Sequence, residues 1–295
     1  MNITNKDLIH FAISNDEFEQ KYPCIALMLK PKMREFNKNN GVRIKSVFER
    51  AEEIDRKYHD VNEAGVMVLK EGASILDIGG ESTRPGAPAV SLEDELARVL
   101  PVVREAVQLN VPISVDTYKA GVMQAVLDAG ADIINDVWAL RQVGAQQVVA
   151  THAQCGVCLM HMHGEPQTMQ TLPMQGSSIQ PVVEFLQHHA QALQAMGVAQ
   201  ERIALDPGVG FGKTVAQNFE LLAHQDQLLA LRYPLLVGWS RKSSIGAVTG
   251  CEVGERMVPS VAAAVLAVER GARIVRVHDV AQTVYALKVW QSAQV

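Results

Sequence analysis

IALDPGVGFGKT, residues 203–214, is an apolar run that ends in an aspartate and continues into a loop with three glycines. Followed by Lys213 and Thr214, these glycines resemble a phosphate-binding nucleotide loop. A P-loop reads G-x-x-x-x-G-K-[ST], and its first glycine would stand at Pro207, which has no N–H to donate. The dinucleotide fingerprint G-x-G-x-x-G also fails, because the glycines run G-x-G-x-G. The stretch therefore predicts a buried strand and a tight loop, and it leaves Lys213 and Thr214 without a role.

Short apolar runs that end in polar residues or glycine recur along the rest of the chain. They are SILDIGG (74–80), VPISVDT (111–117), ADIINDV (131–137), GVCLMHM (156–162), PLLVGWS (234–240) and ARIVRVHD (272–279). Longer stretches with helical periodicity lie between them, such as 182–197 and 90–108, for which Ser91 is the expected N-cap. Near-continuous apolar strands that alternate with amphipathic helices predict a parallel sheet covered on both faces.

CIALML (24–29) is an eighth candidate strand. Eight strands, each followed by a helix, in a chain of this length predict an α/β protein of the (β/α)₈ TIM-barrel class. The alternative is an open doubly wound sheet, which would usually show the glycine fingerprint after its first strand. With no linker or low-complexity segment, we expect one domain over 23–295, after an N-terminal extension of uncertain structure over 1–22. The alanine-rich stretch 258–272 is expected either to pack on the barrel or to contact a second subunit.

The composition excludes several classes of protein. A formal net charge of −5 argues against nucleic acid or an anionic membrane as a partner. Neither a signal-peptide pattern nor an apolar run of transmembrane length is visible, and the four cysteines are too few for a disulfide scaffold. We therefore expect a cytoplasmic protein.

The sequence contains the spacing of a possible zinc site, formed by Cys155, Cys158, His161 and His163. On a strand, however, Cys155 and Cys158 would point to opposite faces, and Cys155 and His161 would lie roughly 20 Å apart. Both thiols are therefore expected to be small core residues.

Polar side chains stand where the predicted strands end, which in a barrel is the face that carries the active site. A strand-end aspartate such as Asp116 or Asp136 is often only a helix N-cap, but seven strands aim polar groups at this face. One set consists of acceptors suited to the edge of a flat heterocycle: Asp116, Asn135 and Asp206. The other set consists of donors to anionic oxygens: Arg84, Lys242, Arg276 and His278. The pattern predicts a pocket for a ring-bearing phosphate or pyrophosphate ester.

Seven ordered motifs carry a family resemblance. They are ILDIGGESTRPGA (75–87), ISVDTYK (113–119), IINDV (133–137), CLMHMHGEPQTMQ (158–170), LDPGVGFGK (205–213), LLVGWSRKS (235–243) and RVHDV (276–280). From about residue 60 to its end, the chain resembles the dihydropteroate synthase family of folate biosynthesis. The resemblance implies a TIM barrel, usually a homodimer, that joins p-aminobenzoate to hydroxymethyl-dihydropterin pyrophosphate with Mg²⁺ and releases pyrophosphate. Sulfonamides compete with p-aminobenzoate in this family, which makes the chain either a drug target or a resistant version.

The resemblance also implies roles for individual residues. The pterin would be held by Asp116, Asn135, Val137, Met160, Asp206, Gly238 and Lys242. The pyrophosphate would be bound by Arg276 and His278. The p-aminobenzoate would be met by Thr83, Arg84, Pro85, Phe211, Lys242 and Ser243. The residues expected to act in catalysis are Asp116, Lys242, Arg276 and His278.

The first part of the chain departs from the family pattern. The family's first strand carries a motif close to N-V-T-P-D-S-F-S-D-G-G, but here Met28 and Lys30 replace its Asn and Thr. A metal ligand is therefore not assigned, although a polar loop with Asn37, Asn39 and Asn40 could supply an amide. Two other functions stay open: a non-catalytic pterin-binding protein, and a pterin-dependent methyltransferase, which would not need the basic groups aimed at a pyrophosphate.

Overall fold

The computed structural model of the chain describes residues 8–11, 69, 71–83, 87–164, 169 and 173–293, the first of these ranges by its backbone alone. Its strands form one sheet in the order β6-β5-β4-β3-β2-β1-β8-β7. Their bounds are β1 Leu8–Phe11, β2 Ile75–Gly79, β3 Ile113–Asp116, β4 Ile133–Asp136, β5 Gly156–Met160, β6 Ile203–Asp206, β7 Leu236–Val237 and β8 Ile274–Arg276. Each of the seven apolar runs quoted above from residue 74 onward therefore contains a strand.

The sheet closes on itself into a barrel. Strands β2 to β6 pair in parallel, β7 pairs in parallel with β8, and a parallel bridge between Leu205 and Leu235 joins the two ends. The backbone N–H of Leu205 also donates to the carbonyl of Pro234, at 3.0 Å. This arrangement confirms the (β/α)₈ TIM-barrel class, because closure places the carboxyl ends of the parallel strands β2 to β8 around one mouth.

The first strand position differs from expectation. It is filled by β1, which lies in the stretch 1–22 and runs antiparallel to both β2 and β8. The expected strand at 24–29 lies outside the described residues. An antiparallel strand can close the ring because its backbone groups pair with those of β2 and β8 as parallel ones would.

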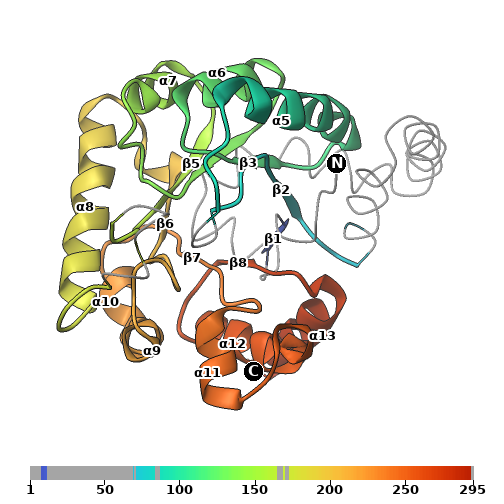
Figure 1. Ribbon diagram of the computed structural model, residues 1–295, viewed down its shortest axis with the longest axis vertical. Coiled ribbons are helices and arrows are strands. Elements are labelled where there is room, and N and C mark those ends of the chain that lie inside the picture. The colour runs from blue at the N-terminus through green and yellow to red at the C-terminus, as the bar shows by residue number, and fades with distance from the viewer. Residues whose placement is uncertain are drawn as a thin grey trace.

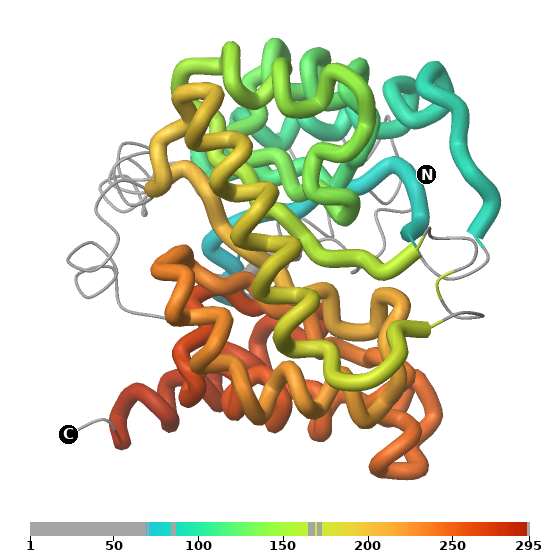
Figure 2. Tube along the Cα trace, turned by 90° about the vertical axis from the view of Figure 1, so that its left-hand side faces the viewer, coloured from blue at the N-terminus to red at the C-terminus, as the bar shows by residue number. Residues whose placement is uncertain are grey.

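The described helices lie along the top, left and bottom of the barrel in Figure 1. They are α5 Leu92–Ala106, α6 Ala120–Asp128, α7 Ala145–Thr151, α8 Ile179–Ala195, α9 Val215–Ala223, α10 Gln225–Leu229, α11 Ser243–Thr249, α12 Met257–Glu269 and α13 Val280–Ser292. Three short 3₁₀ turns are Val107–Leu109, Gln200–Arg202 and Val253–Glu255. In Figure 2, α8 crosses the face between the green helices of the first half and the orange helices of the second.

Local sequence signals explain where two of the helices begin. The Ser91 side chain accepts from the backbone N–H of Asp94 and caps α5, as expected. Thr214 caps α9, and a reciprocal bond between Thr214 and Gln217 completes a capping box. Thr214 thus has a structural role that its place after the glycines did not reveal.

The strands separate apolar from polar side chains across the sheet. One set of alternating residues, including Leu76, Ile113 and Ile134, is part of the apolar core that the helices cover. The other set includes Asp77, Ser114 and Asp116, which are also buried. Because successive side chains of a strand point to opposite faces, these polar groups face the barrel interior. The core between strands and helices holds the fold together, while the barrel interior combines these polar groups with apolar ones such as Ile75 and Met160.

Candidate active site

Arg276 joins three strands across the interior of the barrel. Its Nε lies 2.9 Å from Oδ2 of Asp77 on β2, and one terminal nitrogen lies 3.1 Å from Oδ2 of Asp116 on β3. The Asp77 side chain is fully buried, and that of Asp116 is nearly so. Two buried carboxylates therefore fix the plane of the guanidinium. The predicted pyrophosphate ligand, Arg276, and the predicted pterin ligand, Asp116, are in direct contact.

Asn135 and Asp206 add acceptors and donors beside this network. Asn135 Nδ2 donates to Asp77 Oδ2 at 3.1 Å. Asp206 is buried at the end of β6, and its Oδ1 accepts the backbone N–H of Gly208 at 2.7 Å. Burial raises the pKa of Asp206 to about 6, against the opposing effects of the Gly208 N–H and of nearby Lys242. The expected pterin acceptors Asp116 and Asn135 therefore share one polar network, and Asp206 stands nearby at the end of β6.

An apolar cluster forms one wall of the barrel mouth. It contains Val137 and Met160, both expected to shape the pterin slot, together with Phe211, which was expected to meet p-aminobenzoate. The Lys242 ammonium lies 4.3 Å from the centre of the Phe211 ring, a cation–π contact. Tyr118 and Trp138 complete the cluster, with ring centroids 5.4 Å apart.

The glycine loop after β6 is shaped by close backbone contacts. A Cβ added to Gly208 would lie 1.9 Å from the His161 carbonyl oxygen, and one added to Gly212 would lie 2.4 Å from that of His163. Both glycines also have a φ of +68°, which residues with a side chain rarely adopt. Glycine is therefore required here by packing against the loop after β5, independently of any phosphate.

Lys213 holds this loop from within. Its buried ammonium donates to three carbonyl oxygens, those of Gly208 at 2.9 Å, Phe211 at 3.1 Å and His161 at 3.3 Å. Burial lowers the pKa of Lys213 to about 7, although the negative charge of Asp206 opposes this effect. The residue that suggested a nucleotide loop is thus a structural clamp.

His278 follows β8 and contacts the loop after β7. The backbone N–H of His278 donates to Oγ of Ser240 at 3.1 Å, and Nδ1 of the ring lies 2.8 Å from the same oxygen. Burial, followed by the nearby positive charges of Arg241 and Arg276, lowers the pKa of His278 to about 4. At neutral pH this imidazole is uncharged, so it can offer an anion an N–H donor but no positive charge.

Arg241 fastens the same two strand ends together. Its Nε and a terminal nitrogen pair with the two oxygens of Asp279, at 3.1 and 2.5 Å, and its backbone N–H donates to Ser260. The next residues, Lys242 and Ser243, lead into α11. Gly238 lies beside Arg276, since a Cβ on Gly238 would be 3.8 Å from that of Arg276. The residues expected from the two final motifs are therefore brought together.

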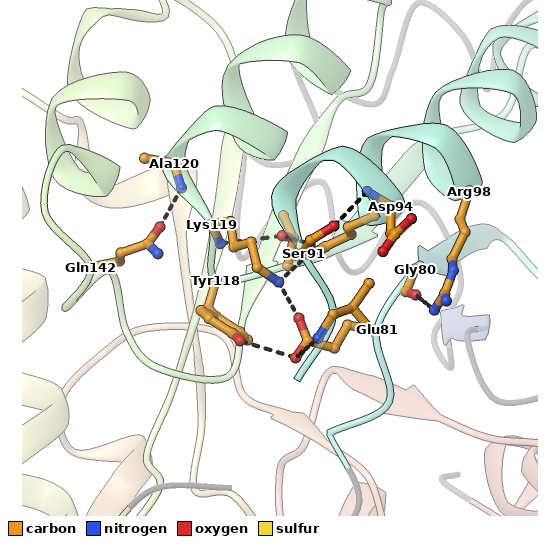
Figure 3. Close-up of polar contacts among 12 residues, drawn as sticks. Gly80, Glu81, Ser91, Asp94, Arg98, Tyr118, Lys119, Ala120 and Gln142 are labelled. Carbon is orange, nitrogen blue, oxygen red and sulfur yellow. Dashed lines mark hydrogen bonds and ion pairs between the residues drawn. The ribbon is translucent and has the colours of Figure 1, made fainter. Parts of the chain in front are cut away.

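Glu81 follows Gly80 in the loop after β2, and its side chain makes several polar contacts at the base of that loop (Figure 3). Oε1 accepts from the hydroxyl of Tyr118 at 3.0 Å and from the backbone N–H of Val90 at 3.3 Å, and Oε2 pairs with Lys119. Of the residues expected to meet p-aminobenzoate from this loop, Thr83 is half-buried, whereas Arg84 and Pro85 lie outside the described residues.

Several neighbours of the predicted ligands were given no individual role from the sequence. They are Asp77, Glu81, Tyr118, Trp138 and Ser240. Asp77 could have been found, because it is the one charged residue inside the apolar run SILDIGG. Glu81 and Ser240 stand among the polar residues at strand ends, whereas Tyr118 and Trp138 carry no comparable signal, since their contacts depend on how neighbouring strand ends come together.

The described parts of the chain do not form a metal site. No group of three or more His, Cys, Asp or Glu side chains within them could hold an ion. Asp77 and Asp116 both contact Arg276. Cys155 and Cys158 are buried free thiols, as expected for core residues. None of the helices in the described ranges is long and apolar enough to cross a membrane.

Comparisons with known proteins agree with this geometry. A family model described as pterin binding enzyme matches residues 45–278. The dihydropteroate synthase of Neisseria meningitidis serogroup C is 51% identical over 228 residues, which cover 76% of this chain and 81% of the relative. That of Escherichia coli K12 is 45% identical over 224 residues, 76% of this chain and 79% of the relative.

Solved structures of dihydropteroate synthases also match this chain. A Burkholderia cenocepacia dihydropteroate synthase complexed with 7,8-dihydropteroate matches with a TM-score of 0.74 and 52% identity, over 79% of this chain and 87% of that one. A Yersinia pestis dihydropteroate synthase in a sulfonamide drug complex matches with a TM-score of 0.77 and 43% identity, over 80% and 87% of the two chains.

Proposed function

The chain belongs to the pterin-binding enzymes, and within them to the dihydropteroate synthases, and from this premise we infer the reaction that its barrel mouth performs. The enzyme is a transferase that condenses p-aminobenzoate with 6-hydroxymethyl-7,8-dihydropterin pyrophosphate. The products are 7,8-dihydropteroate and pyrophosphate. The observation that carries this conclusion is the polar interior of the barrel, where Arg276 contacts both Asp77 and Asp116, beside an apolar wall with Phe211.

We propose that the pterin lies against the polar network and the apolar wall together. Asp116, Asn135 and Asp206 face the donors and acceptors on the edge of the ring, and Val137 and Met160 pack on its face. Gly238 leaves room for the ring, and Lys242 lies between the pterin and Phe211. Burying a carboxylate costs less free energy when ring N–H groups donate hydrogen bonds to it. The site therefore favours a pterin over an apolar ring.

The pyrophosphate is proposed to lie toward β8. Arg276 brings positive charge and His278 brings a neutral N–H donor. Both stabilise the charge that grows on the leaving oxygen as its bond to the pterin methylene breaks. The amine nitrogen of p-aminobenzoate then forms the new bond to that methylene and loses a proton to solvent. The developing positive charge on the pterin is stabilised by Asp116, so no strong base is required.

The p-aminobenzoate is proposed to enter between the loop after β2 and the start of α11. Phe211 and Lys242 would flank its ring, and Ser243 at the first turn of α11 would meet its carboxylate. Thr83 would contact it from the other side, with Arg84 and Pro85. Sulfonamides share the aniline and are proposed to compete for this place.

Mg²⁺ remains a proposal that rests on the family resemblance. The described carboxylates do not fit a metal site, because Asp77 and Asp116 are engaged by Arg276. No step of the mechanism above passes through the ion, and its protein ligands are to be sought outside the described residues.

We also propose a homodimer, formed through α12 and α13. On α12 an exposed stripe of Val258, Ala262 and Leu266 repeats at helical spacing, and Tyr285 and Val289 are exposed on α13. The buried face of α12 packs on the barrel through Ala263 and Ala267. A cytoplasmic location suits the buried free thiols of the described residues. Sedimentation at several protein concentrations tests the dimer, and a monomer throughout would contradict it.

The decisive experiment measures pyrophosphate release by the full chain, with Mg²⁺ and the pterin pyrophosphate, in the presence and absence of p-aminobenzoate. Release that depends on p-aminobenzoate and yields dihydropteroate supports the proposal. Pterin binding without release would instead identify a non-catalytic binding protein. Transfer of a methyl group from a methylated pterin would identify a methyltransferase.

A further inference from the structure

Glu81 holds both ends of the segment Ser82–Ala89. It directly precedes that segment, and its Oε1 accepts the backbone N–H of Val90, the residue that follows it, at 3.3 Å. The Glu81 side chain is only 8% exposed. A single carboxylate therefore closes the base of the segment that carries Thr83.

The same carboxylate is tied to the turn after β3. The Tyr118 hydroxyl donates to Oε1 at 3.0 Å, and the Lys119 ammonium pairs with Oε2 (Figure 3). Lys119 also lies 2.5 Å from Oε2 of Glu95 on α5, whose Oε1 accepts from the Thr117 hydroxyl at 2.7 Å. Although burial opposes it, contact with the two carboxylates raises the pKa of Lys119, so the ammonium stays charged.

Tyr118 connects this frame to the barrel mouth. Its ring packs edge-on against Trp138, and both rings belong to the cluster that contains Met160 and Phe211. One side of Tyr118 thus lies on the wall of the mouth, while its hydroxyl contacts the base of the loop. The polar frame consists of Glu81, Tyr118, Lys119 and Glu95, none of which is proposed to contact the reacting atoms.

We propose that Glu81 is a positioning residue that, by closing the base of this loop, sets Thr83 for p-aminobenzoate. The inference rests on the proposed function, because it assigns a substrate to that segment. Glu81 acts through the loop and through Tyr118. The pterin is held by the interior of the barrel, so its binding does not depend on this frame.

Two variants and a matched control test the proposal. Glu81→Gln keeps the size of the side chain but loses the charge that faces Lys119, and Tyr118→Phe keeps the ring but loses the donor. Each is expected to raise KM for p-aminobenzoate by about tenfold, the cost of one hydrogen bond to a charged group, with KM for the pterin pyrophosphate within about twofold. The control is Glu184→Gln on the exposed face of α8, where the carboxylate accepts a hydrogen bond from Gln180.

A second readout does not require activity. Deuterium exchange of a peptide covering residues 82–90 is expected to speed up in Glu81→Gln and to stay unchanged in Glu184→Gln, as measured on the full chain. Equal increases in both KM values, or unchanged exchange with an unchanged KM for p-aminobenzoate, would overturn the positioning role. If the unaltered chain releases no pyrophosphate, the proposed function is wrong, whereas the exchange comparison still decides whether Glu81 holds the segment.

Discussion

Arg276 and Asp77 meet across the barrel although 199 positions separate them in the sequence, with Nε of the arginine 2.9 Å from Oδ2 of the aspartate. Asn135 donates to the same oxygen. The Asp77 side chain is fully buried, so this one carboxylate orients a guanidinium and an amide that are both expected to face the ligand. Asp77 is therefore expected to position two groups that face the ligand.

Replacing Asp77 by Asn is expected to misplace Arg276. Both donors use Oδ2 of Asp77, so an amide oxygen can still accept from them, but the amide carries no charge to pair with the guanidinium. We expect affinity for the pterin pyrophosphate to fall about tenfold, and the free energy of unfolding to fall by about 1–3 kcal/mol, as for a lost buried bond to a charged group. Calorimetric titration and urea unfolding measure the two effects.

The control for this change is Asp128→Asn, because Asp128 contacts Gln124 on the exposed surface of α6. It should change neither quantity measurably. An Asp77→Asn variant with unaltered affinity would show that Arg276 is oriented by Asp116 alone.

Alanine at Gly208 is expected to destabilise the loop after β6 far more than alanine at Gly250. The two glycines have similar φ angles of +68° and +74°, but only at Gly208 would a Cβ collide, at 1.9 Å from the His161 carbonyl oxygen. The backbone strain common to both costs about 1–2 kcal/mol, and overpacking at Gly208 adds about 1–3 kcal/mol. Thermal or urea unfolding of both variants tests this prediction. Equal losses of unfolding free energy would contradict the clash with the His161 carbonyl.

Lys213→Met is expected to lower the free energy of unfolding. It is not expected to change nucleotide binding, because we expect the unaltered chain to bind no nucleotide. The change removes the donor to three carbonyl oxygens, which should lower the free energy of unfolding by about 1–3 kcal/mol. Thr214→Ala, which removes only the helix cap, should cost about 1 kcal/mol. Binding of ATP to the unaltered chain, lost in Lys213→Met, would restore the nucleotide-loop interpretation.

His278 is expected to titrate near pH 4, well below an ordinary histidine. Because the unfolded chain takes up this proton at a higher pH than the folded one, His278 makes the protein less stable as pH falls from about 6.5 to about 4. Asp206 has the opposite effect over part of this range, since its raised pKa of about 6 favours the folded state as pH falls.

The contribution of His278 is therefore measured as a difference. The unfolding free energy of the unaltered chain minus that of His278→Asn should decrease as pH falls through this window. NMR titration of the imidazole gives its pKa directly. A midpoint near 6.5 would mean that His278 is charged at mildly acidic pH and brings positive charge to the anion.

Sequence patterns predicted most of the fold because they are local. Each apolar run from SILDIGG to ARIVRVHD contains a strand, and Ser91 caps its helix as expected. The first strand was expected at 24–29, which lies outside the described residues, whereas β1 at Leu8–Phe11 was not expected, because it is short and is specified by its pairing with β2 and β8. The candidate site was predicted in part, since strand ends must meet at one mouth.

The sequence by itself determined the barrel and the face on which its polar residues gather, because alternation along strands and periodicity along helices act over a few residues. It also supplied the motifs that carry the family resemblance. Only the tertiary structure decided which of these residues touch. Pairing of the strands side by side brings Arg276 to Asp77 and Glu81 to Tyr118. Burial makes His278 neutral, and the packed loop turns Lys213 into a clamp for three carbonyls. IALDPGVGFGKT shows the difference: its strand was visible in the sequence, but the reason for its glycines lies in the neighbouring loop after β5.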